Sequence, residues 1–248
     1  MLADAPDLDV LIIPLGGGGL MAGNAVAAKA IKPGIELIGV EAKLYPSFFN
    51  AVRAQDEPIG GPTLAEGIAV KTVGQLALPV ISSLVSDIVL VGEDLIERAV
   101  NAYASLQHSL AEGAGATGLA AMLKEPERYA GRKVGLVLTG GNIDTRLLAA
   151  IMVRELERDD RIVAFRLTTS DRPGLLGRIA SLLGEEGANI LEVSHGRLFL
   201  DVPAKGVTLD VTVETRGPAH SRTIEDALAK NGFAPRRILP RGLAEPAR

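Results

Sequence analysis

Residues 10–20 read VLIIPLGGGGL, and this stretch decides the fold of the chain. Residues 10–13 form an uninterrupted apolar run, which is typical of a strand buried on both faces. Four glycines follow at residues 16–19. Because glycine has no Cβ, successive backbone N–H groups can converge there on one anion, and a helix expected over residues 20–32 adds the positive end of its dipole. The stretch therefore predicts a strand, a phosphate-binding turn and a helix.

Strands and helices alternate through the rest of the first half. Apolar runs predict strands over residues 35–40, 87–91 and 134–138. A loop is expected over residues 55–72, which are rich in glycine and proline. The alternation indicates an α/β fold in which a parallel sheet has helices on both faces. The expected helices cover residues 46–54, 74–84, 93–106, 115–123 and 144–158.

The second half follows a different pattern. A charge-rich run at residues 157–161 predicts a domain boundary, which divides the chain into residues 1–158 and 159–248. Beyond it the expected elements follow the order βαββαβ, which is the ferredoxin-like split unit. Its strands are expected over residues 162–168, 190–197, 207–214 and 234–239, and its helices over residues 174–185 and 221–231.

The composition excludes several classes of protein. Hydrophobic residues make up 47% of the 248 positions and charged residues 23%, which fits a packed globular protein. Aromatic residues make up only 3% and the net charge is −4, so the stacking surface or basic face of a nucleic-acid binder is missing. The chain has no cysteine for disulfides or thiolate metal sites. Without a targeting segment or a long apolar run, we expect a cytoplasmic protein that does not enter membranes.

The glycine run at residues 16–19 admits four interpretations. A dinucleotide site would use Glu41 as its ribose-binding acid, but the third glycine of its fingerprint would fall on Met21. A nucleotide P-loop needs Gly-Lys-Ser/Thr, which is absent. The other two are a monophosphate cofactor held by backbone amides and an empty turn. A second glycine turn, LTGGN at residues 138–142, follows another strand and so predicts a ligand at the carboxyl edge of the sheet.

Four segments in this order resemble the pyridoxal-phosphate dependent threonine dehydratase (threonine ammonia-lyase) family. They are PLGGGGL at 14–20, TLAEGIAV at 63–70, EGAGA at 112–116 and LTGGN at 138–142, with Glu66 where the family usually has aspartate. The resemblance implies pyridoxal 5′-phosphate as cofactor. It also implies a fold type II lobe like that of the tryptophan synthase β subunit, present here incompletely.

The resemblance also implies roles for individual residues. The glycine run would hold the cofactor phosphate, Thr139 would meet the pyridine nitrogen, and Glu112 would lie near the ring. Charge at a helix N-terminus is the alternative role of Glu112. No metal site is expected, because Ser47 replaces a carboxylate where some relatives bind a cation beside Glu41, and the histidines lack suitably spaced partners. The implied cofactor-binding residues are Gly16, Gly17, Gly18, Gly19, Leu20, Glu112, Thr139 and Gly140.

The implied reaction converts L-threonine, or alternatively L-serine, by β-elimination, and threonine yields 2-oxobutanoate and ammonia. In the family, a lysine upstream of the phosphate turn forms a Schiff base with the cofactor and transfers the proton. The first lysine here is Lys29, after the turn. We therefore expect no catalytic residue in this chain, no turnover by the chain alone, and a natural domain that begins earlier.

The second half resembles the ACT domain, a regulatory amino-acid-binding module, through DRPGLL at 171–176 and GANI at 187–190. The resemblance implies allosteric control by an amino acid such as isoleucine or valine, and pairing into a homo-oligomer. A capped turn with structural glycine and proline is the alternative. Residues 197–205 are expected to form a hairpin that blunts a sheet edge. The implied effector-binding residues are Asp171, Gly174, Leu175 and Asn189.

Two rival interpretations remain open from the sequence. One is a non-catalytic regulatory protein in which the ACT module is joined to a relic cofactor lobe. The other is a Rossmann-type dehydrogenase, which Met21 opposes because it occupies the place of the third glycine.

Overall fold

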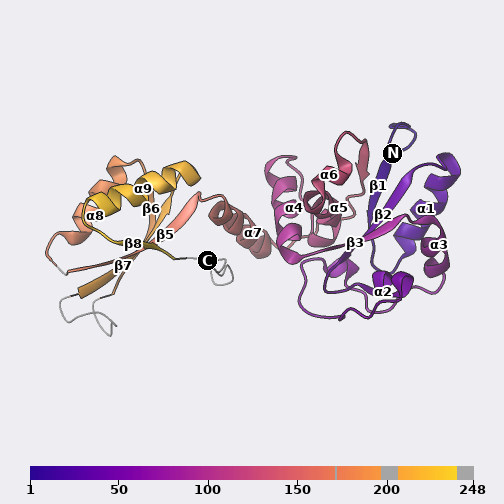
Figure 1. Cartoon of the computed structure of the whole chain (residues 1–248), viewed down its shortest axis with the longest axis horizontal. Coiled ribbons are helices and arrows are strands. Elements are labelled where there is room, and N and C mark those ends of the chain that lie inside the picture. The colour runs from indigo at the N-terminus through magenta and orange to yellow at the C-terminus, as the bar shows by residue number, and fades with distance from the viewer. Residues whose placement is uncertain (171, 197–205, 239–248) are drawn as a thin grey trace. The chain divides into compact units, whose positions relative to one another are not determined.

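The computed structural model describes residues 1–170, 172–196 and 206–238 (Figure 1). Contacts between Cα atoms divide the chain into two units, Met1–Ile151 and Met152–Arg248. The division falls within helix α7 (Thr145–Arg158), whereas the boundary predicted from the sequence lies at the end of that helix. That boundary stays a prediction.

The first unit contains the predicted parallel sheet. Its strands lie in the order β3-β2-β1-β4, and every neighbouring pair is parallel. All five residues of β1 are buried, as the apolar run predicts. The strands are β1 (Val10–Pro14), β2 (Glu36–Ala42), β3 (Asp87–Val91) and β4 (Val134–Leu136).

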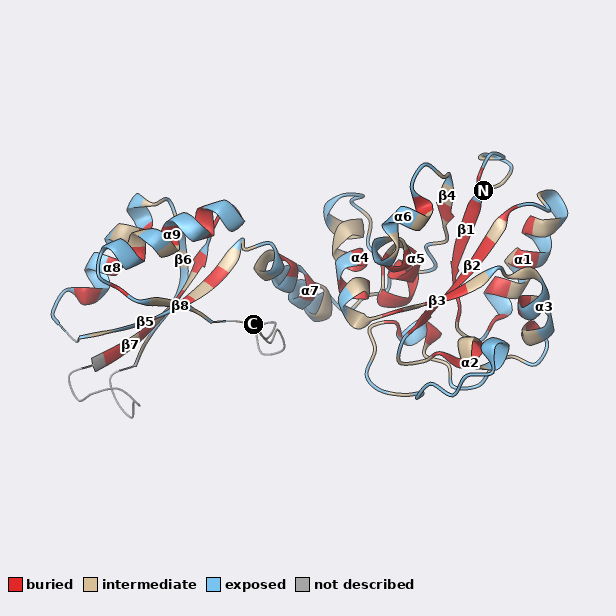
Figure 2. Cartoon of the chain, in the orientation of Figure 1, coloured by how far each residue is buried: buried red, intermediate tan, exposed pale blue. Residues whose placement is uncertain are grey.

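Helices cover both faces of this sheet, which confirms the predicted fold class (Figure 2). Ile12 of β1 packs into a core with α4, α5, α6 and the first part of α7, while its neighbour Ile13 packs into a second core with α1, α2 and α3. Successive strand residues point to opposite faces, so one apolar run supplies both cores. The helices are α1 (Gly19–Ile31), α2 (Ser47–Arg53), α3 (Ala77–Leu84), α4 (Glu93–Ser105), α5 (Gly113–Lys124) and α6 (Pro126–Tyr129).

The structure corrects some predicted boundaries. The predicted loop contains a 3-10 turn, η1 (Glu66–Ile68), and α6 is a helix that the sequence did not predict. Both are too short to show a hydrophobic period. Helix α3 begins three residues later than predicted, whereas α5 begins two residues earlier.

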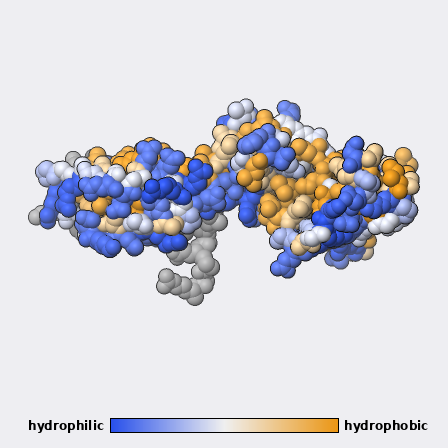
Figure 3. All heavy atoms as spheres, turned by 90° about the horizontal axis from the view of Figure 1, so that it is seen from above, coloured by the Kyte–Doolittle hydropathy of each residue, from blue (hydrophilic) through white to orange (hydrophobic). Residues whose placement is uncertain are grey.

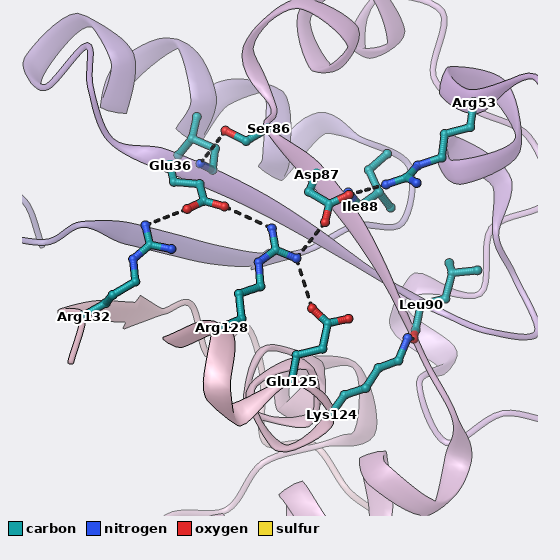
Figure 4. Close-up of polar contacts among 11 residues, drawn as sticks. Glu36, Arg53, Ser86, Asp87, Ile88, Leu90, Lys124, Glu125, Arg128 and Arg132 are labelled. Atoms are coloured by element: carbon teal, nitrogen blue, oxygen red, sulfur yellow. Dashed lines mark hydrogen bonds and ion pairs between the residues drawn. The ribbon is translucent and has the colours of Figure 1, made fainter. Parts of the chain in front are cut away.

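An ion-pair network joins the amino ends of β2 and β3 to α6 (Figure 4). The Arg128 guanidinium lies 3.0 Å from Glu36, 2.7 Å from Asp87 and 3.1 Å from Glu125. Burial opposes ionisation of Glu36, but hydrogen bonds from Arg132 and Arg128 outweigh it and lower the pKa of Glu36. The Arg128 side chain is only 26% exposed, so its ion pairs are partly shielded from water.

Replacing this arginine should weaken the first unit. Arg128→Ala is expected to lower the free energy of unfolding by about 2 kcal/mol, because it leaves partly buried carboxylates short of a partner. Urea unfolding followed by circular dichroism would measure the loss. The control is Lys133→Ala, since Lys133 pairs with Asp7 at a site where both side chains are more than half exposed, and little or no change is expected there. Equal losses in both variants would contradict the prediction.

The second unit has the predicted βαββαβ order and an antiparallel sheet in the order β6-β7-β5-β8. The alternating strand β7 buries Val207, Leu209, Val211 and Val213 against its two helices. The predicted hairpin at residues 197–205 lies outside the described residues. The elements are β5 (Ile162–Ser170), α8 (Leu175–Glu185), β6 (Asn189–Gly196), β7 (Gly206–Glu214), α9 (Pro218–Lys230) and β8 (Pro235–Arg237).

Two surface properties bear on partners. Among the described residues, none of the helices combines the length and apolar character needed to cross a membrane. Apolar side chains cover much of the first unit on the side that Figure 3 shows. Exposed large apolar side chains of this unit include Val26, Ile31, Leu76, Leu106 and Leu110.

Candidate functional site

The two glycine turns meet at one pocket. Strands β1 and β4 are parallel neighbours, so the turns that follow them emerge at the same edge of the sheet. They border a pocket of about 240 Å³ whose wall includes both Gly17 and Thr139. The lining residues are Pro14, Gly16, Gly17, Gly18, Gly19, Leu20, Met21, Gly67, Ile68, Glu112, Ala114 and Thr139.

The first turn is packed closely from behind. A Cβ added to Gly16 would lie 2.9 Å from the Cα atom of Ile68. Gly18 has a φ of +87°, and a Cβ there would collide with the Phe48 ring and lie 2.7 Å from the Cβ of Ala77. Positive φ is a conformation that glycine adopts without strain. The turn therefore requires glycine at position 18 for both its backbone angle and its packing.

The front of the turn is open. A Cβ added to Gly17 or Gly19 would have no atom within 4 Å. The backbone N–H groups of Gly17, Gly18 and Gly19 donate to no acceptor in the described part of the chain. They stand at the N-terminus of α1, a helix of 13 residues, where the dipole favours an anion. The turn thus offers unused donors and free space to a phosphate.

Glu112 lies at the N-cap position of α5, but its side chain makes no capping hydrogen bond. Its carboxylate instead borders the pocket, and its N–H donates to the carbonyl of Gly140 at 3.0 Å. A Cβ on Gly140 would lie 2.6 Å from Oε1 of Glu112. Gly140 therefore packs behind Glu112, and it alone of the eight predicted cofactor residues does not line the pocket.

A second cavity of about 170 Å³ adjoins the first and shares Gly67, Glu112 and Ala114 with it. Its other lining residues are Leu64, Glu66, Gly113, Asn142, Ile143, Asp144, Leu147 and Ile151. Sequence reasoning assigned no role to Gly67, Ile68 or Ala114. The signal was present for all three, because Gly67 and Ile68 lie within the motif at residues 63–70 and Ala114 lies within the motif at residues 112–116.

These residues fit pyridoxal phosphate. Free amides at the helix N-terminus suit its phosphate, and the exposed Thr139 brings a neutral hydroxyl to the same pocket. No lysine is among the residues that line the pocket. Lys29 and Lys32 instead bind the carbonyls of Ile35 and Leu8, beside the amino ends of β2 and β1.

Glu41 does not line the pocket, although the sequence left it open as a ribose-binding or cation-binding acid. It is 1% exposed, and its two carboxylate oxygens accept hydrogen bonds from the N–H groups of Phe48 and Phe49, each at 2.8 Å. The Ser47 hydroxyl donates to the carbonyl of Val70. Both side chains thus hold α2 in place. Among the described residues, no three or more His, Cys, Asp or Glu side chains are grouped so that they could hold a metal ion.

Glu41 should make stability depend on pH. Burial raises its pKa from 4.5 to about 7, against the effect of the backbone hydrogen bonds. The folded protein holds this proton more tightly, so the stability is greatest below the unfolded pKa and is lost as pH rises to about 7. Between pH 5 and 8 the wild type should lose about 2 kcal/mol relative to Glu41→Gln. Urea unfolding at several pH values measures this, and parallel curves for both proteins would refute it.

The structure describes three of the four predicted effector residues. Gly174, with a φ of +80°, is the N-cap of α8, and Leu175 after it is buried in the core. Asn189 donates to Glu214 on the neighbouring strand at 3.4 Å. Asp171 lies outside the described residues.

His220 is held by hydrogen bonds to the backbone, and His108 lies at the surface. His220 is buried, with Nδ1 accepting from the N–H of Arg216 and Nε2 donating to the carbonyl of Glu186. His108 is exposed three residues after the end of α4, with a φ of +54°.

Comparisons with known proteins agree with this geometry. Residues 1–140 match the family described as pyridoxal-phosphate dependent enzyme, and residues 164–232 match the ACT domain. The L-threonine ammonia-lyase of Thermotoga maritima is 36% identical over 235 residues, which cover 94% of this chain and 58% of that protein. The chain thus spans little more than half the length of this relative.

Solved structures show the same relationship. Maize serine racemase is 32% identical with a TM-score of 0.55, covering 62% of this chain and 50% of that one. Threonine deaminase isoform 2 from Solanum lycopersicum is 28% identical with a TM-score of 0.56, covering 61% and 43%. The family match spans more than half of the sequence, and the matched residues include the whole glycine turn and Glu112. This chain therefore belongs to the family of pyridoxal-phosphate dependent enzymes, with an ACT domain in its second half.

Proposed function

We propose that this chain is the cofactor-holding and regulatory part of an L-threonine ammonia-lyase. The observation that carries the proposal is the single pocket that both glycine turns and Glu112 share. The relative from Thermotoga maritima bears that name and aligns with 94% of the chain. The reaction would remove ammonia from L-threonine, or from L-serine, and would leave 2-oxobutanoate from threonine.

Different residues of the pocket would hold different parts of the cofactor. Bound pyridoxal phosphate supplies a ring that withdraws electrons from the α-carbon of an amino acid. The amides of Gly17, Gly18 and Gly19 would hold its phosphate, and the Thr139 hydroxyl would donate to its ring nitrogen. A hydroxyl brings no charge, so the ring nitrogen would stay largely unprotonated. Glu112 places a carboxylate on the wall between the two cavities, where it would attract an ammonium group.

Removal of an α-proton also needs a base, and the described pocket wall contains no lysine. We therefore expect the full chain to bind pyridoxine 5′-phosphate, which cannot react with surface lysines, without turning over threonine. Calorimetry measures the binding, and 2-oxobutanoate formation in the presence of pyridoxal phosphate measures the turnover. Absence of binding would refute the proposed function, whereas turnover would refute the argument from the missing lysine.

The second half is proposed to bind an amino acid effector, with isoleucine and valine as first candidates. The match to the ACT domain supports this, as does Gly174 at the start of α8, where the helix dipole favours a carboxylate. Calorimetry of the full chain with isoleucine, valine and threonine tests it. Such control fits a role in isoleucine biosynthesis in the cytoplasm.

The lysine-free pocket supports a second candidate, a non-catalytic regulatory protein that binds amino acids. It predicts heat on adding an amino acid but none on adding pyridoxine 5′-phosphate, so the same calorimetry separates the two functions. Both candidates are proposed to act as homo-oligomers. The apolar surface of the first unit and the outer edge of β6 support pairing, and sedimentation would measure it.

A further inference from the structure

Phe48 forms the back of the phosphate turn although it lies thirty residues further along the chain. It is completely buried at the start of α2, and its ring reaches Gly18. Its Cε2 atom is 3.1 Å from the place that a Cβ on Gly18 would occupy, and Ala77 of α3 closes the other side. Movement of this ring would open space behind the one residue of the turn that has a left-handed conformation.

Glu41 determines where Phe48 stands. Its oxygens accept from the N–H groups of Phe48 and Phe49, so one buried side chain fixes two successive residues of the first turn of α2. Helix α2 has only seven residues and could not hold this position by itself. The first residue of α2 is Ser47, and its hydroxyl fixes it further by donating to the carbonyl of Val70.

The turn is held at two further points, one by η1 and one by the segment that follows it. Ile68 packs behind Gly16, and a Cβ on Gly74 would lie 2.6 Å from the carbonyl oxygen of Gly17. These contacts leave little freedom at Gly16 and Gly17. Gly18 accepts from the N–H of Ala22 at 2.8 Å within α1, and the three atoms nearest to a Cβ added to it belong to Phe48 and Ala77.

We propose that Glu41 and Phe48 are positioning residues for the phosphate turn, with Glu41 fixing the start of α2 and Phe48 keeping Gly18 in the conformation that aims the amides into the pocket. Neither residue touches the ligand. The inference rests on the proposed function, because it concerns the same phosphate pocket.

The test compares two adjacent phenylalanines in the full chain. Phe48→Leu removes the ring behind Gly18, while the control Phe49→Leu removes a half-buried ring that faces the Arg53 guanidinium at 4.8 Å. The probes are pyridoxine 5′-phosphate and inorganic phosphate. Phe48→Leu should weaken both by about tenfold or more, because small misplacements of binding groups cost that much, and Phe49→Leu should change neither.

A second measurement covers the case in which Phe48→Leu folds poorly. Glu41→Gln keeps the ring but gives up one of its two backbone acceptors, so it should weaken both probes in the same direction by a smaller factor. In both variants, amide hydrogen exchange should rise at Ala22, whose N–H donates to the Gly18 carbonyl at 2.8 Å, more than at later residues of α1, which a general loss of packing would not produce.

The outcomes separate this inference from the proposed function. If the wild type binds neither probe, the proposed function fails. If the wild type binds both and Phe48→Leu binds them equally well, only the positioning role fails. Weakening of pyridoxine 5′-phosphate without weakening of inorganic phosphate would also overturn it, because the effect would then lie at the ring and not at the turn.

Discussion

Gly19→Asp is expected to weaken binding of pyridoxine 5′-phosphate by about a hundredfold while leaving the fold intact. A Cβ at position 19 meets no atom within 4 Å, so the side chain can be added without a clash. Its carboxylate would stand in the pocket against the incoming phosphate. At an effective dielectric constant of about 20, like charges some 5 Å apart repel by about 3 kcal/mol, which corresponds to a loss of affinity of about a hundredfold.

The stability of this variant should move in the opposite direction. Position 19 opens α1, and an acidic residue in the first turn of a helix stabilises it by about 0.3–1 kcal/mol. Calorimetry and thermal unfolding of the same sample would therefore show lost binding beside an unchanged or raised melting temperature. The matched control is Gly23→Asp, one turn later, where the glycine is exposed and a Cβ also meets nothing. Equal loss of binding in the control would show that the ligand does not sit at the turn.

The local parts of this fold could be predicted because their cause is local. The apolar run at residues 10–13 identified β1, and the structure buries that strand completely. The strict alternation of apolar and polar residues at 207–214 identified β7. In the structure, its apolar residues are the ones that point into the core. The joint pocket also followed from the sequence, since turns after parallel strands share one edge of a sheet.

Contacts between distant segments left no such signal. Arg128 joins carboxylates at positions 36, 87 and 125, and no periodicity reveals that these residues meet. The role of Glu41 was hidden for a different reason. Its partners are backbone N–H groups, which almost every residue possesses, so its sequence context suggested a ligand instead of a helix terminus. The sequence could therefore locate the glycine turns but not the side chains that hold them.

The second large effect concerns the packing of Gly113 at the start of α5. A Cβ there would collide with the carbonyl of Leu64 and lie 3.0 Å from the nitrogen of Ala65. Both neighbours are backbone atoms, so the clash cannot be relieved by turning a side chain. Gly113→Ala is expected to lower the free energy of unfolding by about 3 kcal/mol, at the upper end for overpacking. It should also displace Glu112 and weaken binding of pyridoxine 5′-phosphate.

Helix propensity alone predicts the opposite effect, because alanine is favoured over glycine within helices by about 1 kcal/mol. Gly118→Ala in the same helix is the control. Its nearest atom to an added Cβ, in Leu136, is 3.6 Å away, which is ordinary contact, so this variant should be as stable as the wild type or more stable. Urea unfolding of both variants compares them directly. If Gly113→Ala proved as stable as Gly118→Ala, α5 would not be packed against the segment at residues 64–65, and the wall that carries Glu112 would have to be placed elsewhere.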